Sequence, residues 1–181
     1  MQVAGTLTHM DLDRLFHDYH EPLVRYLTRR LGDRDRAEEL AQETFVRAMR
    51  QESIGAGSER SWLFAVATNL VRDDARREAR QRARLAELAA EAREREEGNV
   101  IPLSADRGER AELAREAMET LAERDREALL MREEGLDYTE IAEALGLSVG
   151  SVGTTLLRAR RRLVAAYEAL VPGEGEDHAA S

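Results

Sequence analysis

Arginine is the residue type with the clearest chemistry in this sequence. All 27 basic residues are arginine, and the chain contains no lysine. One cluster, Arg72–Arg84, holds six arginines against three acidic residues, and a second comprises Arg158, Arg160, Arg161 and Arg162. Although the net charge is −9, two basic islands in an acidic chain predict local contacts with nucleic-acid phosphates. Either cluster taken alone also fits a solvated helix face.

Groups that could perform catalysis or bind a metal are sparse. Among the four histidines, His17 and His20 lie three residues apart, with Asp18 and Glu21 beside them, and form a weak candidate ligand set. The chain has no cysteine, which excludes disulfides and thiolate metal sites. We see no nucleophile constellation and no phosphate-binding loop. The sequence therefore predicts a protein that is not an enzyme and needs no metal or other cofactor.

The composition indicates which elements position the arginines. Hydrophobic residues make up 43% of the chain, aromatic residues only 4%, and there are three prolines. Alanine, leucine, glutamate and arginine lose little rotamer freedom in a helix, so their abundance favours an all-α fold. No apolar run approaches the length needed to cross a bilayer, and no secretory signal is visible at the N-terminus. We expect a cytoplasmic protein without membrane insertion.

The N-terminal part predicts three helices. Apolar residues recur at three- and four-residue steps over Leu12–Leu27, where Pro22 should kink the helix or open a second one, and Gly32 ends it. Asp35 followed by Glu38 resembles a capping box at the start of the next helix.

A loop and a linker follow in the sequence. Ser53–Ser58 is predicted to be a loop, and a long third helix begins near Trp62 and continues through the arginine cluster to Ala92. Gly98–Gly108 has the composition of a flexible linker. We expect an N-terminal domain over 9–92, an acidic linker over 93–108, a second domain over 109–170 and a disordered tail over 171–181.

The second domain contains a helix-turn-helix pattern. Its short first helix is Tyr138–Leu145, Gly146 permits a left-handed turn, Leu147 fills the corner, and Ser148 can cap the last helix, Val149–Leu170. Helices near Glu109 and over Glu123–Glu134 should support it. This arrangement places a helix in the major groove of DNA. A plain helical hairpin in a bundle is the alternative.

Three segments resemble one known family. Asp35–Ala48 looks like the second conserved helix of domain 2 of bacterial sigma factors, and Trp62–Arg77 looks like its promoter-melting helix. Leu121–Arg162 is similar to sigma domain 4. The resemblance covers Leu12–Leu163 and, since no bulky domain intervenes, fits the extracytoplasmic-function (ECF) group. It implies a non-enzymatic subunit that directs core RNA polymerase to promoters.

The resemblance also implies site residues and partners. The residues expected to dock on core RNA polymerase, through its beta-prime and beta subunits, are Asp35, Glu38, Glu39, Gln42, Glu43 and Arg47. Contacts with the −10 element of promoter DNA fall to Ser61, Trp62, Asn69, Arg72, Asp73, Arg76, Arg77 and Arg80. Contacts with the −35 element fall to Ser148, Gly150, Ser151, Gly153, Thr154, Thr155, Arg158, Arg160 and Arg161. Loop Gln51–Ser61 would select the −10 base, and an anti-sigma factor is a further expected partner.

The sequence departs from the family at the −35 reader. Where the family has a basic, a small and a basic residue, this chain has Gly153, Thr154 and Thr155. Two arginine-type contacts are therefore missing, and a glycine inside a helix costs about 1 kcal/mol relative to alanine. We expect weaker −35 recognition that relies on shape and on Ser151, Thr154 and Arg158, with domain 2 carrying more of the specificity.

The sequence also carries an expectation about the free chain and leaves one rival function open. The free protein should expose two DNA-reading surfaces joined by an acidic linker, in which Glu94, Glu96, Glu97 and Asp106 could mimic nucleic acid. The rival is a helix-turn-helix regulator that acts without core polymerase and whose N-terminal bundle dimerises or senses an effector. Such a regulator would bind a palindromic operator.

Overall fold

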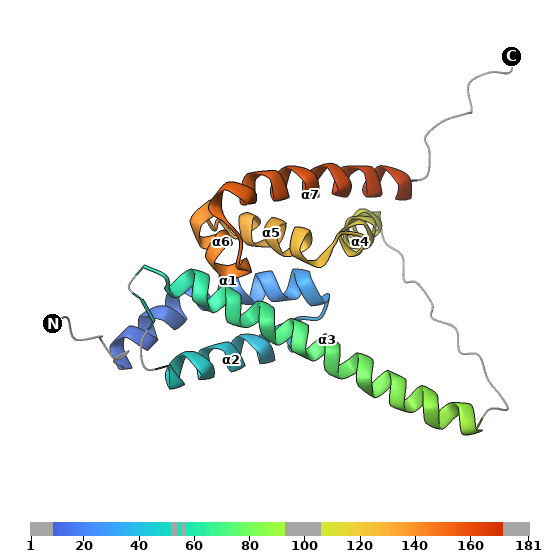
Figure 1. Ribbon diagram of the computed structural model, residues 1–181, viewed down its shortest axis with the longest axis horizontal. Helices are drawn as coiled ribbons and strands as arrows, with labels where there is room; N and C mark the ends of the chain where they lie inside the picture. Colours follow the sequence, from blue (N-terminus) through green and yellow to red (C-terminus); the bar gives the residue numbers. More distant parts are fainter. Residues whose placement is uncertain (1–8, 52–53, 56, 93–105, 172–181) are drawn as a thin grey trace, which may run out of the picture.

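The protein is described by a computed structural model that covers residues 9–51, 54–55, 57–92 and 106–171 (Figure 1). These residues form helices and no strand, which confirms the all-α prediction. The helices are α1 (His9–Leu31), α2 (Arg34–Arg50), α3 (Glu59–Ala92), α4 (Asp106–Glu119), α5 (Glu123–Glu133), α6 (Tyr138–Leu145) and α7 (Val149–Leu170). We refer to α1–α3 as the N-terminal half and to α4–α7 as the C-terminal half.

The N-terminal half is a three-helix unit with an apolar centre. Leu23 and Leu27 of α1 and Leu63 and Phe64 of α3 are completely buried, because one face of each helix is apolar at helical spacing. Within this core the Tyr26 hydroxyl lies 2.8 Å from the Thr68 hydroxyl, so both polar groups are hydrogen-bonded. This packing holds α3, which carries the first arginine cluster, rigidly against α1.

Two helix boundaries differ from the expectation. Pro22 lies inside α1 without ending it, so the predicted start of a second helix there is wrong. The buried apolar face that continues through Leu23 and Leu27 holds the helix together despite the missing N–H group. The N-cap of α2 is Asp33, whose carboxylate accepts from the Arg36 N–H at 3.1 Å, and Asp35 lies in the first turn instead. The predicted Asp35 capping box is therefore wrong.

The helix-turn-helix is present as predicted. Asp137 and Glu140 form a capping box at the start of α6, with hydrogen bonds of 2.8 and 2.7 Å. Gly146 adopts the left-handed conformation with φ 63°, and the Leu147 N–H donates to the Ala142 carbonyl at 2.8 Å. Ser148 occupies the N-cap position of α7 but donates or accepts no side-chain capping bond there.

The predicted linker is described only at its end. Since α4 begins at Asp106, the last three residues of the expected 93–108 linker are helical. Glu94, Glu96, Glu97 and almost the whole predicted tail lie outside the described residues.

The two halves pack directly against each other. Helix α6 lies against α3, and α5 lies against α1 (Figure 1). Buried apolar residues of both halves, including Phe64 of α3 and Ile141 of α6, belong to one continuous core. We expected a free chain that exposes two DNA-reading surfaces joined by an acidic linker; in this structure the two halves that carry them are also in direct contact. The second part of α3 projects from the body (Figure 1), and its residues 75–85 are exposed on all sides.

Candidate nucleic-acid and partner interfaces

The outer face of α2 carries the predicted polymerase-docking residues. Its inner face, with Ala37, Leu40, Ala41 and Phe45, is buried, so the polar residues of an amphipathic helix must point outward. The docking set is exposed or half-buried on that outer side: Asp35, Glu38, Glu39, Gln42, Glu43 and Arg47. Four of its members, Glu38, Glu39, Glu43 and Arg47, take part in i,i+4 or i,i+3 ion pairs along the helix, as in Arg47–Glu43 at 3.0 Å. The outer face is thus a regular row of carboxylates and arginines.

Arg36 connects this face to α3. Its guanidinium binds the Asp74 carboxylate through two hydrogen bonds, of 2.9 and 2.5 Å, and it also binds Glu39. Hydrogen bonding to Asp74, and then to Glu39, raises the pKa of Arg36, so this link keeps its charge throughout the accessible pH range. A polar groove of about 290 Å³ between α2 and α3 contains Glu43 on one wall and Arg77 on the other. The structure therefore brings part of the predicted docking set next to part of the predicted −10 set.

The first three predicted −10 residues, in the first part of α3, differ in exposure and in their contacts. Ser61 is only 3% exposed, and its hydroxyl donates to the Glu143 carboxylate of the C-terminal half at 2.6 Å. Trp62 is half-buried and packs against the core. Asn69 is exposed on the surface of α3, so its amide can reach a ligand.

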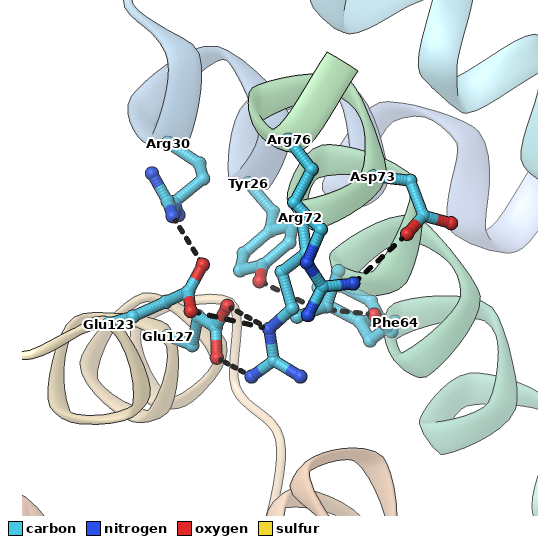
Figure 2. A network of polar contacts seen from close by, with 9 residues as sticks. Tyr26, Arg30, Phe64, Arg72, Asp73, Arg76, Glu123 and Glu127 are labelled. Carbon is cyan, nitrogen blue, oxygen red and sulfur yellow. Dashed lines mark hydrogen bonds and ion pairs between the residues drawn. The ribbon is translucent and has the colours of Figure 1, made fainter. Parts of the chain in front are cut away.

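Arg72 is engaged by the C-terminal half. Figure 2 shows its guanidinium pointing at Glu127 of α5, with hydrogen bonds of 3.1 and 2.5 Å, and at Glu123, 3.8 Å away. The Glu127 side chain is 0% exposed, whereas that of Arg72 is 25% exposed. Burial raises the pKa of Glu127, and the hydrogen bond from Arg72 acts in the opposite direction. Arg72, which was predicted to contact DNA, is thus paired with the buried Glu127 carboxylate.

The remaining −10 residues lie on the open part of α3. Asp73, Arg76, Arg77 and Arg80 are exposed. Arg76 pairs with Asp73 at 3.2 Å, as Figure 2 shows, and Arg80 donates to the Arg76 carbonyl at 3.2 Å. These surface contacts are worth little in water, so the guanidinium groups can exchange them for phosphates.

The predicted −35 set divides into exposed and buried residues. Ser148, Gly150 and Thr154 are exposed and Ser151 and Gly153 are half-buried near the start of α7. Thr155 is only 5% exposed, because it lies on the face of α7 that packs against the other helices of the C-terminal half. Its assignment as a DNA contact does not fit this geometry.

The arginines further along α7 also divide. Arg160 and Arg161 are exposed. Arg158 is exposed as well, but it donates two hydrogen bonds, of 3.0 and 2.5 Å, to the Asp125 carboxylate, which Arg162 approaches at 3.3 Å. Asp125 is 1% exposed, and the hydrogen bond from Arg158 holds its pKa below the ordinary value. Arg158 therefore serves first as an internal tie between α7 and α5.

Sequence reasoning missed the acidic residues that receive these arginines. Asp125, Glu127 and Glu134 are buried, and none of them was predicted to be a site residue. A signal was present, because Glu127 lies four residues before Met131 on the apolar face of α5. A carboxylate on an apolar face requires a cationic partner.

The structure bears on two further features of the described part of the chain, a metal site at the histidine pair and a membrane-spanning helix. His20 stacks on Phe16, with ring centroids 4.4 Å apart, and no group of three or more potential ligands there could hold a metal ion. No helix among the described residues is both long and apolar enough to cross a bilayer.

Comparisons with known proteins agree with this architecture. The family model described as Sigma-70 region 2 matches residues 15–81, and Sigma-70 region 4 matches residues 111–163. The chain is 31% identical over 165 residues to RNA polymerase sigma factor YlaC of Bacillus subtilis, covering 87% of this chain and 92% of that protein. It is 30% identical to ECF RNA polymerase sigma factor SigM of the same organism, covering 87% and 96%.

Solved structures show the same fold. CnrH in complex with the cytosolic domain of CnrY matches with a TM-score of 0.62 at 23% identity, over 90% of this chain and 91% of that chain. The sigma factor RpoE in complex with the anti-sigma factor NepR, from Bartonella quintana, matches with a TM-score of 0.59 at 22% identity, over 88% and 98%. Because both halves match sigma regions in the expected order, the rival reading of a polymerase-independent regulator is not favoured. The chain belongs to the ECF group of the sigma-70 family.

Proposed function

We propose that this protein is an alternative sigma factor in which α2 docks on core RNA polymerase, α3 reads and opens the −10 element, and α6–α7 reads the −35 element. The observation that carries the proposal is that one chain matches Sigma-70 region 2 over residues 15–81 and Sigma-70 region 4 over residues 111–163, in that order. The protein is a specificity subunit, and no catalytic step is assigned to it.

The docking assignment rests on the charge pattern of α2. Its outward carboxylates, such as Glu39 and Glu43, suit an arginine-rich helical partner, as expected for the beta-prime subunit. Because Arg36 ties α2 to Asp74 on α3, docking would also fix the orientation of the −10 reader. Polymerase binding and DNA reading would then act on one rigid unit.

The −10 assignment rests on Asn69 and the open arginines of α3. An amide presents both a donor and an acceptor to the edge of an unstacked base, and a pocket must offset the few kcal/mol that base flipping costs. Arg76, Arg77 and Arg80 are exposed on the same helix and can hold the backbone phosphates without regard to sequence.

The −35 assignment rests on the start of α7. Ser148, Gly150 and Thr154 are exposed there, and Arg160 and Arg161 lie further along for phosphates. With Thr155 buried and Arg158 bound to Asp125, the base-reading surface is small and uncharged. This supports a −35 reader that contributes less specificity than α3.

An anti-sigma factor is the proposed regulator. One structure of similar fold is that of the sigma factor RpoE solved with the anti-sigma factor NepR, and a second is that of CnrH solved with the cytosolic domain of CnrY. We place the protein, its polymerase partner and its promoters in the cytoplasm.

The decisive test is run-off transcription with purified bacterial core polymerase on a promoter library. Adding the protein should create new start sites that share a −10 motif. Absence of binding to core enzyme, or an unchanged set of start sites, would contradict the proposal. Specific binding to a palindromic operator without polymerase would favour the regulator instead.

Replacing Asn69 with alanine tests the base-reading role. We expect N69A to lower discrimination among −10 sequences by about tenfold, which corresponds to the 1–3 kcal/mol carried by a good amide–base contact. Affinity for core polymerase should not change, because Asn69 is on α3 and the docking face is on α2.

Gln81→Ala is the matched control, since Gln81 is an exposed amide on the same helix. If N69A and Q81A gave the same −10 profile as the unchanged protein, Asn69 would not be the base reader.

A further inference from the structure

Helix α7 carries a row of apolar residues on the side that faces away from the rest of the C-terminal half. Leu157, Val164 and Val171 are 51%, 55% and 39% exposed, and they follow one another at intervals of seven residues. Seven residues make almost two full helical turns, so the three side chains lie along one line. The opposite side, with Leu156 and Ala159, is buried against the neighbouring helices, and Figure 1 shows α7 along the outer edge of the molecule. We call Leu157, Val164 and Val171 the α7 stripe.

Two charged residues lie on either side of the centre of this stripe. Arg161 precedes Val164 by three residues and Glu168 follows it by four, so both charges lie on the same side of the helix as Val164. Both are exposed, and in the described part of the chain neither forms an ion pair or a side-chain hydrogen bond. The stripe therefore has an open positive charge before its centre and an open negative charge after it.

This order of charges is complementary to itself. When two α7 helices pack antiparallel with Val164 at the two-fold axis, Arg161 of each copy lies beside Glu168 of the partner subunit, and Leu157 lies beside Val171 of the partner subunit. A parallel pair would instead bring Arg161 to Arg161 and Glu168 to Glu168, and like charges repel. Single exposed apolar residues are common on protein surfaces, but a row at seven-residue spacing with matching charges is typical of a helix-packing seam.

We propose that a second copy of this chain docks on the α7 stripe, and that the free protein forms a dimer through an antiparallel pair of α7 helices centred on Val164. The Val171 N–H still donates to the Tyr167 carbonyl at 3.1 Å, so the stripe is helical to its end. From Leu157 to Val171 it extends about 21 Å at about 1.5 Å per residue. A contact of this length is smaller than that of an obligate dimer, and we expect a dissociation constant on the order of 10 µM.

The dimer removes part of α7 from contact with DNA. Arg161 belongs to the proposed −35 set, and Leu157 lies three residues after the exposed Thr154 of that set. An Arg161 side chain that pairs with Glu168 of the partner subunit cannot bind a phosphate at the same time. One α7 therefore serves either the second copy or the −35 element. This consequence rests on the proposed function, whereas the self-association does not.

Sedimentation of the full chain at increasing concentration measures the dimer. We expect E168R and R161E each to weaken self-association by about tenfold or more, because each variant places like charges at both symmetric contacts. The double variant R161E/E168R exchanges the two charges and should return the dissociation constant toward that of the original protein. Glu116→Arg, on the exposed surface of α4, makes the same change of charge away from the stripe and should leave self-association unchanged.

Disulfide cross-linking tests the direction of the helices. Because the chain has no cysteine, Val164→Cys and Leu157→Cys each introduce a single thiol. In the antiparallel pair the two copies of position 164 face each other, whereas position 157 faces position 171, and a disulfide requires close Cβ atoms. Mild oxidation should therefore link V164C into a covalent dimer and leave L157C monomeric. Ala169→Cys, exposed on another side of α7, is the control that should also stay monomeric.

The proposal is overturned if the original protein stays monomeric well above the expected dissociation constant, or if E168R dimerises as the original protein does while its helical signal in circular dichroism is intact. Linking of L157C as readily as V164C would overturn the antiparallel arrangement. Run-off transcription with core polymerase separates these results from the proposed function. A monomeric protein that creates new start sites would leave the sigma role standing and remove self-association alone.

Discussion

At the residue scale, two acidic side chains on α5 show how position decides the state of a carboxyl group. Asp125 and Glu127 are only two residues apart, and both are buried. The hydrogen bond from Arg158 lowers the pKa of Asp125, whereas burial raises the pKa of Glu127 despite its bond to Arg72. The Asp125 carboxylate therefore joins α5 to α7 within the C-terminal half. Burying the charge of Glu127, which faces the N-terminal half, costs more free energy.

The Asp125 tie predicts a pH-dependent loss of stability. D125N should lower the free energy of unfolding at neutral pH by about 1–3 kcal/mol, because hydrogen bonds to charged groups are lost. The folded pKa of Asp125 lies below 3.8, so the ion pair stabilises the fold above that pH and the effect disappears as pH falls through the folded pKa. Urea unfolding followed by circular dichroism at several pH values measures it.

The exposed Asp18 of α1 offers a control for this measurement, and D18N should leave the free energy of unfolding nearly unchanged. A D125N deficit that stayed constant, or grew, as the pH fell below the ordinary aspartate value would contradict the assigned role of Asp125.

At the element scale, α7 combines a reading surface with a weak point in its backbone. Gly153 lies in the second turn of the helix, where glycine costs conformational entropy that alanine does not. A Cβ atom added at Gly153 would lie 3.6 Å from the Tyr138 ring, an ordinary van der Waals contact. The helix therefore has room for an alanine here, and packing does not require glycine at this position.

We expect Gly153→Ala to stabilise the protein by about 1 kcal/mol through helix propensity. Urea unfolding of the full chain would detect the change. Gly150→Ala, in the first turn and with nothing within 4 Å of the added carbon, should give a smaller gain because helix ends fray. Destabilisation by G153A would mean that close packing or backbone geometry requires the glycine.

At the scale of the whole molecule, the two halves differ in how much DNA sequence they can read. The N-terminal half offers an exposed amide and several open arginines, whereas the start of α7 offers small, uncharged side chains. Direct base readout depends on hydrogen-bonding groups at the edges of the bases. We therefore propose that the N-terminal half carries most of the promoter specificity.

Randomising each promoter element in a reporter tests this division. We expect transcription to vary over a wider range when the −10 element is randomised than when the −35 element is. Equal or greater variation at −35 would show that α7 reads bases through contacts other than those its exposed residues provide.

Local patterns in the sequence were sufficient to predict most of the elements. Apolar spacing located the helices, and the pattern around Gly146 located the helix-turn-helix. These features depend on neighbours within a few residues, so they can be read along the chain. The same locality explains the errors at Pro22 and Asp35, where packing and a nearby aspartate outweighed the local signal.

The partners of the site residues were decided only by the tertiary structure. Arg72 and Glu127 are 55 positions apart, and Arg25 and Glu134 are 109 apart, so no periodic pattern links them. Thr155 has the chemistry of a DNA contact but faces the core. The sequence by itself determined which helices form and which family they belong to. Only folding decided that Arg25, Arg72 and Arg158 pair with distant carboxylates, because the packing of the helices brings those partners together.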